Sequence, residues 1–255
     1  DIPQDIQNAM VEENELYPAE TIQKKRDKVN YEMMLRTLAE ANRPCILAGS
    51  GIRSGDVMEE FLEFVDRMGI PVIGGAWVAD NLYMEHPLYF GPSGNIGPRT
   101  GNFILQNADV ILSLGNSLGF RQTGFNQADF APNAKIIMVD ADENEAQKPG
   151  LRIDQFIHRE LKDFFHEMSE QKFKVSLPED WMEYCRMLKN KFNSFEAVQN
   201  IEMEDRVCSY YFWQVFGRYE EDDSILALGN NTANTAKMQI GVNKRGQRVL
   251  TNYTC

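Results

Sequence analysis

The chain has 255 residues, 43% of them hydrophobic, and a formal net charge of −12 at pH 7. This length fits one large domain or one and a half ordinary ones. The acidic balance argues against non-specific binding to nucleic acid or to an anionic membrane surface, and no apolar run approaches the about 20 residues of a membrane span. The four cysteines form no CxxC pair, which favours a reducing, cytoplasmic compartment over a zinc site or a redox dithiol.

The start of the chain contains two prolines, Pro3 and Pro18, and residues 1–18 are therefore expected to be extended. Apolar residues at helical spacing predict a helix over Thr21–Ala41. It should end before Arg43-Pro44, because the residue before a proline avoids helical backbone angles.

The stretch 45–52 is an apolar run that breaks at two glycines, which is typical of a buried parallel strand followed by a tight turn. A helix is predicted over 56–68, with Ser54 as its candidate N-cap. Strand, glycine turn and helix are how a phosphate-binding site begins. The fingerprint is incomplete, because Ser54 occupies the third glycine position and the next strand, 71–75, ends without an acid. A tight turn without a ligand is an equal alternative.

Residues 76–101 contain four glycines and three prolines, which predicts a long functional loop, with a surface insertion as the alternative. Further strands are predicted at 110–114, 135–139 and 155–157, and helices at 101–108 and 160–171. Strands alternating with helices over 21–172 predict an α/β fold: an open, Rossmann-like parallel sheet with helices on both faces.

The carboxyl ends of parallel strands form the ligand-binding edge of such a sheet. The residues at these ends are small, polar or acidic: Gly49, Ser50, Gly51, Gly74, Gly75, Gly115, Asn116, Asp140 and Asp142. Their convergence predicts a nucleotide site. Asp140 is the candidate for the ribose-binding carboxylate that the second strand lacks, and its alternative role is the N-cap of a turn at 143–147.

The character of the chain changes after residue 172. Residues 173–204 are interpreted as a linker helix, and 205–255 as a second, partial α/β unit. In that unit we predict helices at 205–219 and 232–240 and strands at 225–228 and 248–251. One such unit cannot bury its own sheet. Its open strand edges should either cause self-association or dock against the preceding domain.

Several short segments occur in the order and spacing of one family. They are Asp1–Ile6, Arg43-Pro44, Ala48–Gly51, Ile70–Val72, His86–Leu88, Ala108–Val110, Phe130–Pro132 and Val139–Asp142. Through them the chain resembles thiamine diphosphate-dependent enzymes of the acetolactate synthase (large subunit) group. The resemblance assigns 1–20 to the end of a pyrimidine-binding domain and linker, 21–172 to the central domain, 173–204 to the linker helix and 205–255 to the start of the pyrophosphate-binding domain.

For the parent protein the resemblance implies thiamine diphosphate and Mg²⁺, a 2-oxo acid substrate, homo-oligomers and a place in branched-chain amino acid biosynthesis. The family's catalytic glutamate would lie before Asp1, and its Gly-Asp-Gly metal motif beyond Cys255. We therefore expect a piece of a longer polypeptide that contains no catalytic or metal-ligating residue. Alone, it is expected to be inactive and to bind no cofactor.

The family's central domain binds FAD in some members and ADP or nothing in others. The resemblance carries the nucleotide role onto Gly49, Ser50, Gly51, Gly94, Gly115, Asn116, Arg121, Asp140 and Asp142. The loop at Gly91–Asn95 departs from the pattern of FAD-binding members. Arg121 would pair with phosphate through its planar fork, or else lie on the surface beside an acid. Asn230 and Asn231 fall where the family reaches the cofactor diphosphate, and they could equally cap a helix.

Two other classes of function stay open. The central fold also resembles sirtuin-type and transhydrogenase NAD domains, so the chain could be a stand-alone NAD- or ADP-binding module. It could also be a structural or interaction domain with an empty cleft. The segments Asp1–Ile6 and 205–255 favour the enzyme fragment, and binding measurements with FAD, ADP and NAD separate the three.

Overall fold

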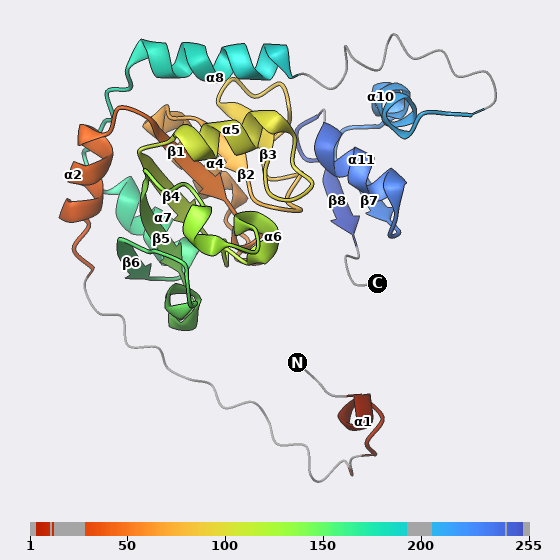
Figure 1. Ribbon diagram of the computed structural model, residues 1–255, viewed down its shortest axis with the longest axis horizontal. Coiled ribbons are helices and arrows are strands. Elements are labelled where there is room, and N and C mark those ends of the chain that lie inside the picture. Colours follow the sequence, from red (N-terminus) through yellow and green to blue (C-terminus); the bar gives the residue numbers. More distant parts are fainter. Residues whose placement is uncertain (1–3, 11, 13–28, 193–205, 243, 252–255) are drawn as a thin grey trace. The chain divides into compact units, whose positions relative to one another are not determined.

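The computed structural model describes residues 4–10, 12, 29–192, 206–242 and 244–251 (Figure 1). The chain divides into two compact units, Asp1–Asn30 and Tyr31–Cys255. In the first unit, helix α1 (Gln4–Gln7) forms where an extended chain was expected, because a proline at the start of a helix does not oppose its first turn.

The expected helix at 21–41 is only partly within the described residues, since 21–28 lie outside them. Residues 29–31 are not helical, and the helix begins at Glu32.

The second unit contains a six-stranded sheet. Its strands are β1 (Pro44–Ala48), β2 (Val72–Gly74), β3 (Tyr89–Pro92), β4 (Val110–Leu114), β5 (Lys135–Asp140) and β6 (Gln155–His158). All neighbouring strands are parallel, in the order β3-β2-β1-β4-β5-β6. The predicted α/β fold is confirmed. The strand order reverses between β1 and β4, which is where doubly wound sheets open a crevice.

The helices between and after these strands follow the predicted alternation. They are α2 (Glu32–Glu40), α3 (Gly51–Ser54), α4 (Met58–Met68), α5 (Arg99–Asn107), α6 (Phe120–Thr123), α7 (Leu161–Ser169) and α8 (Glu179–Lys191), with 3-10 turns η2 (Gln127–Asp129) and η3 (Glu143–Gln147). Among the described residues no helix is long and apolar enough to cross a membrane.

Strand β3 was not predicted, because residues 76–101 were expected to form one loop. Its residues Tyr89–Pro92 pair with β2 and end the sheet on that side. Glycine and proline in so short a segment indicate a loop, but proline is tolerated at a sheet edge, where one side of the backbone has no partner.

The expectation for Ser54 was also wrong. Ser54 is the last residue of α3, and its hydroxyl donates to Ser50 O at 3.2 Å. Helix α4 begins after Val57, which makes no side-chain cap. Between the two helices Asp56 has a φ of +52°, which is outside the right-handed helical region, so a single helix cannot run through this point.

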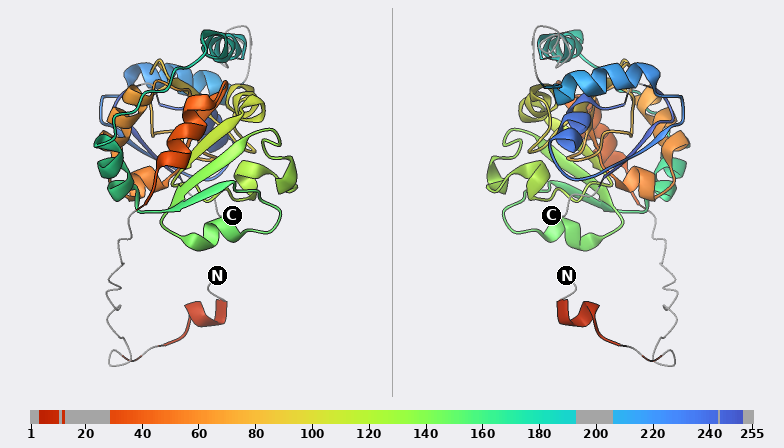
Figure 2. Two further views of the ribbon diagram at one scale, coloured as in Figure 1. Left: turned by 90° about the vertical axis from the view of Figure 1, so that its left-hand side faces the viewer. Right: turned by 90° about the vertical axis from the view of Figure 1, so that its right-hand side faces the viewer.

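Helices cover both faces of the sheet (Figures 1 and 2). On one face, α5 and α8 pack on inward side chains of β1, β4 and β5 such as Leu47, Ile111 and Met138. On the other, α4 packs against α7 through aromatic rings, with Phe64 and Phe164 centroids 5.7 Å apart. Helix α8, expected as a linker, buries Trp181 in this core, and its indole N–H donates to Pro44 O at 3.0 Å.

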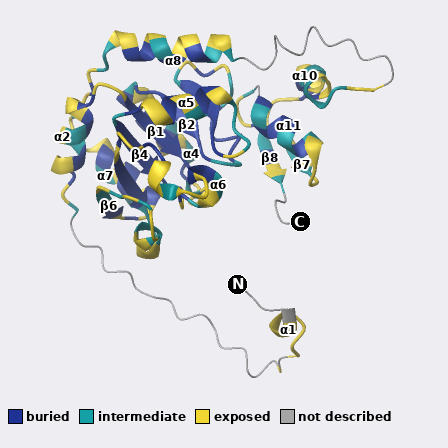
Figure 3. Cartoon of the chain, viewed as in Figure 1, coloured by how far each residue is buried: buried dark blue, intermediate teal, exposed yellow. Residues whose placement is uncertain are grey.

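The remaining described residues form α10 (Ser209–Tyr219), β7 (Ile225–Leu228), α11 (Thr232–Ile240) and β8 (Arg248–Thr251). Strands β7 and β8 pair in parallel as a separate two-stranded sheet, at the bounds predicted from the sequence. Several residues of β7 and α10 are exposed, among them Ile225, Tyr211 and Tyr219, and Figure 3 colours parts of both elements as exposed. This small sheet contacts the loops of the large one: Arg248 Nε donates to Asp80 Oδ2 at 2.9 Å, and Gln239 Nε2 donates to Ile96 O at 2.6 Å. The expected docking against the preceding domain is therefore observed, and self-association stays a prediction.

Candidate functional site

Two glycine turns meet where the strand order reverses. A Cβ on Gly49 would lie 2.0 Å from Gly115 O, and one on Gly51 would lie 2.8 Å from Gly115 Cα. Gly115 itself has a φ of +55°, a left-handed conformation that favours glycine. These three glycines are therefore needed for the close approach of the β1 and β4 turns to each other.

The backbone amides of this turn already have partners within the chain. Gly49 N donates to Leu114 O and Gly51 N donates to Gly115 O, each at 2.9 Å. The helix that follows, α3, has only four residues, so its dipole is small. In this conformation the Gly49 and Gly51 amides are not available to a phosphate.

A cavity of about 320 Å³ opens beside these turns, toward the ends of β5 and β6. Its lining includes Ser50, Gly51, Gly115, Asp140 and Asp142. The structure thus brings together five of the predicted nucleotide-binding residues from three strand ends. This is the arrangement that the sheet topology predicted.

Asp140 is half-buried at the carboxyl end of β5. Burial raises the pKa of its carboxyl group, and hydrogen bonds from the backbone, including Asp142 N at 3.0 Å, partly oppose that shift. A half-buried carboxylate at a strand end can accept hydrogen bonds from ribose hydroxyls. The alternative role for Asp140, as N-cap of the following turn, is taken by another residue.

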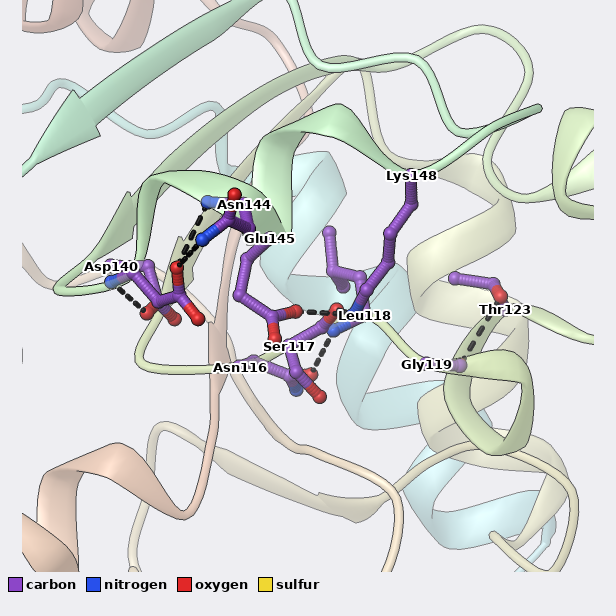
Figure 4. A network of polar contacts seen from close by, with 10 residues as sticks. Asn116, Ser117, Leu118, Gly119, Thr123, Asp140, Asn144, Glu145 and Lys148 are labelled. Carbon is purple, nitrogen blue, oxygen red and sulfur yellow. Dashed lines mark hydrogen bonds and ion pairs between the residues drawn. The ribbon is translucent and has the colours of Figure 1, made fainter. Parts of the chain in front are cut away.

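That residue is Asp142, whose Oδ1 accepts from Asn144 N at 2.9 Å and caps η3. These hydrogen bonds hold the pKa of Asp142 below its usual range. Figure 4 shows the turn held over the β4 end by Lys148, which pairs with Glu145 and donates to Ser117 O. Side-chain contacts thus tie this turn to the segment that follows β4.

The charge of the cavity is negative. Asp140, Asp142, Glu145 and Glu160 line it, against Lys162, and Glu145 is compensated by Lys148. Carboxylates repel phosphate but accept hydrogen bonds from hydroxyl and amino groups. The cavity therefore suits the nucleoside part of a ligand better than its diphosphate.

Gly49 takes part in the contact between the turns but does not line the cavity, and three more of the predicted residues around the large sheet also lie outside the lining. Gly94, at a φ of +87°, packs on Ala76 and is clamped by Asn102, which donates to Gly94 O at 3.0 Å. Asn116 is buried, and its Oδ1 accepts from Leu118 N at 3.0 Å. The Arg121 guanidinium lies over the Trp77 ring, 5.4 Å from its centroid. All three stabilise the loops of the crevice.

Asn230 and Asn231 lie between β7, a strand of the small sheet, and helix α11. Asn231 is the N-cap of α11, and its Oδ1 accepts from Ala233 N at 2.9 Å. In this conformation the capping alternative is the observed role of Asn231. Diphosphate contacts by Asn230 and Asn231 stay a prediction.

The sequence reading missed Ser117, Glu160 and Lys162, which also line the cavity. Glu160 and Lys162 follow β6, the neighbour of β5 in the sheet. Their signal in the sequence is their position shortly after the strand predicted at 155–157. Among the described residues, no three His, Cys, Asp or Glu side chains converge to hold a metal ion.

The strand order, with glycine turns at its reversal, defines a doubly wound α/β domain. Residues 32–168, more than half of the chain, match the family described as "Thiamine pyrophosphate enzyme, central domain". The chain belongs to this family of thiamine diphosphate-dependent enzymes, as the resemblance predicted. The matched residues lie inside the predicted central domain, 21–172, whose boundaries stay a prediction.

Curated relatives agree with this assignment. A sulfoacetaldehyde acetyltransferase of Castellaniella defragrans is 41% identical over 109 residues, which are 42% of this chain and 18% of that protein. A probable acetolactate synthase large subunit of Methanococcus aeolicus is 37% identical over 118 residues, 45% of this chain and 19% of that protein. The acetolactate synthase large subunit of Corynebacterium glutamicum is 28% identical over 207 residues, 75% of this chain and 32% of that protein. The chain thus spans a third or less of these relatives.

Proposed function

We propose that this chain supplies the central domain and the beginning of the pyrophosphate-binding domain of a thiamine diphosphate-dependent enzyme that acts on a 2-oxo acid. The single observation that carries the proposal is the family match over residues 32–168. The similarity to an acetolactate synthase large subunit over 207 residues supports the choice of substrate class. Sulfoacetaldehyde acetyltransferases among the relatives leave the acceptor of the second half-reaction open.

Thiamine diphosphate supplies an electron sink that allows a 2-oxo acid to lose carbon dioxide. Of the described residues, Asn230 and Asn231 follow β7 and precede the N-terminus of α11, where backbone N–H groups favour a diphosphate. Their role would be to position that group. Mg²⁺ and the groups that move protons would be held by parts of the enzyme that correspond to the unmatched two thirds of the Corynebacterium glutamicum relative.

The test of this assignment is an activity assay with residues 1–255 alone. With pyruvate, thiamine diphosphate, Mg²⁺ and FAD in excess, we expect no turnover. Turnover that rises in proportion to the amount of this purified chain would contradict the placement of the catalytic groups elsewhere. We propose that the whole enzyme is a homo-oligomer in the cytoplasm and acts on a 2-oxo acid with thiamine diphosphate and Mg²⁺.

We propose further that the cavity beside Asp140 holds the nucleoside part of an adenine nucleotide such as ADP or FAD. Asp140 would accept hydrogen bonds from the ribose hydroxyls, because it is half-buried at the strand end that forms the cavity wall. The phosphates would leave the cavity, away from Asp142 and Glu160. The cavity volume of about 320 Å³ suits a nucleoside rather than a whole dinucleotide.

Calorimetry with ADP, FAD, NAD and adenosine tests this second proposal. Asp140→Asn should weaken binding by about 1–3 kcal/mol through the loss of a charged hydrogen bond. Asp180→Asn, which changes an exposed acid on α8, is the matched control and should bind as the wild type does. Equal affinity of wild type and Asp140→Asn would refute the ribose contact. Absence of binding for all four ligands would favour a domain with an empty cleft.

A further inference from the structure

A second cavity, of about 720 Å³, lies away from the strand ends. It is formed by the end of α8, by the segment around β3, and by α10 and α11, the two helices next to the small sheet. Residues from each of these elements line it: Lys189, Phe192, Phe90, Arg218 and Gln239. No part of the proposed function uses this cavity.

The cavity is basic, although the chain carries a net charge of −12. Lys189, Arg218 and Lys244 line it, and Glu85 is the single acid in the lining. The cavity beside Asp140 has the opposite balance. A local excess of positive charge in an acidic protein draws anions selectively to that place.

Lys189 is the most buried of the three cations. Its ammonium group donates to Met84 O and Tyr89 O, each at 2.7 Å, which leaves one of its three N–H donors. Both partners are neutral carbonyls, so the positive charge is not compensated by them. Burial lowers the pKa of Lys189, and Glu85 opposes that shift. An anion in the cavity would stabilise the charged form.

Arg218 is exposed at the end of α10, and no acid pairs with it in the part of the chain that the structure describes. Its planar guanidinium can bind a carboxylate or a phosphate with two parallel hydrogen bonds. Lys244 donates to Glu220 O at 2.5 Å and lies 3.6 Å from Asp222. Arg218 is therefore the cation most available to a ligand.

The rest of the lining suits an organic body. Phe90, Phe192, Pro98 and Met84 supply apolar walls. The buried Oε1 atom of Gln214 has no hydrogen-bond partner within the described chain, and a buried acceptor without a donor is costly. Gln214 lines the cavity, so a rotation of its side chain would allow this atom to accept from a hydroxyl or amino group of a ligand. Inorganic anions have no such apolar body.

We propose that this cavity binds a small organic anion, held by Lys189, Arg218 and Lys244 and seated against Phe90 and Phe192. The ligand class is a carboxylate or phosphate with a planar or apolar body and a hydrogen-bond donor. This inference does not depend on the proposed enzymatic function or on the nucleotide site.

The test uses two fluorescent probes that differ by one carboxylate, 6-hydroxy-2-naphthoate and 2-naphthol, titrated into the full chain. We expect the carboxylate probe to bind about tenfold more tightly, and its affinity to fall as salt is raised. Arg218→Gln should weaken its binding about five- to tenfold, since an exposed arginine contributes a partly screened interaction. Circular dichroism of the variant checks that it is folded.

Arg186→Gln is the matched control, because Arg186 is exposed on α8 and does not line the cavity. It should bind the probe as the wild type does. Equal binding of the two probes would overturn the proposal, because naphthol binding needs only an apolar surface. Unchanged affinity in folded Arg218→Gln, or no binding of the carboxylate at millimolar concentration, would also overturn it.

Discussion

Substitution of Gly49 by alanine tests whether the two glycine turns are packed as tightly as the geometry indicates. The added Cβ would lie 2.0 Å from Gly115 O and 2.6 Å from Asn116 Cα. Both are backbone atoms, so no side chain can rotate away to make room. The turns must separate, and the hydrogen bonds from Gly49 N and Gly51 N across this contact must lengthen.

The cost follows from these two effects. Overpacking of a rigid site costs about 1–3 kcal/mol, and two weakened backbone hydrogen bonds cost about 1 kcal/mol each. The sum, about 3–5 kcal/mol, is a large part of the stability of an ordinary domain, which is about 5–15 kcal/mol. For a protein of this size it corresponds to a fall in melting temperature of about 6–20 °C.

Thermal and urea unfolding followed by tryptophan fluorescence measure the effect, because Trp181 is buried in the same sheet core. Gly229→Ala is the control: a Cβ at Gly229 meets nothing within 4 Å and its φ is not positive. The control should stay within about 0.5 kcal/mol of the wild type. If Gly49→Ala has the same melting temperature and urea midpoint as Gly229→Ala, the contact between the turns is not rigid and this prediction is wrong.

Two further predictions concern paired charges. Lys237 is fully buried, with Nζ 3.0 Å from Glu220 Oε2, so Lys237→Met should cost about 3–5 kcal/mol in urea unfolding by stranding the carboxylate. The double variant with Glu220→Gln should recover most of that loss, and no recovery would show that the pair is not the cause. Hydrogen bonding to Arg159 holds the pKa of Glu167 below its usual range. The ionised Glu167 carboxylate therefore stabilises the folded protein at pH values above its unfolded pKa, and this contribution is lost as the pH falls through its folded pKa. The loss of stability in Glu167→Gln should therefore shrink below about pH 4, and a constant difference down to pH 2 would contradict this origin.

The alternation of strands and helices could be predicted from local sequence because each buried strand is a short apolar run. Strands β7 and β8 were predicted at their observed bounds. Strand β3 could not be, since Tyr89–Pro92 becomes a strand only by pairing with β2. Helix α2 begins later than expected, because the helical spacing of apolar residues identifies the buried face of a helix but does not fix the residue at which the helix starts.

The candidate site could be predicted as a place but not as a set of contacts. Parallel topology brings strand ends together, and Asp140 was found in this way. The role of Gly49 is a tertiary contact with Gly115, which no local pattern contains. Asp142 and Asp140 are two residues apart and of one type, so which of them caps the turn depends on backbone angles that the sequence does not specify. The guanidinium of Arg121 lies over the ring of Trp77, a tertiary contact that the local sequence does not contain.

The contact between the two glycine turns has a mechanical consequence for the crevice. Its floor, where Gly49 meets Gly115, is made of backbone atoms with no space between them, and it cannot widen without breaking both turns. Glu145 of η3 lines the cavity, and this turn forms part of the cavity rim; Lys148 ties it to Ser117 O through one long side chain. Side-chain ties can exchange partners while the backbone beneath them stays fixed. Adjustment to an occupant of different size will therefore take place at the rim, and its range is limited by the reach of a single lysine.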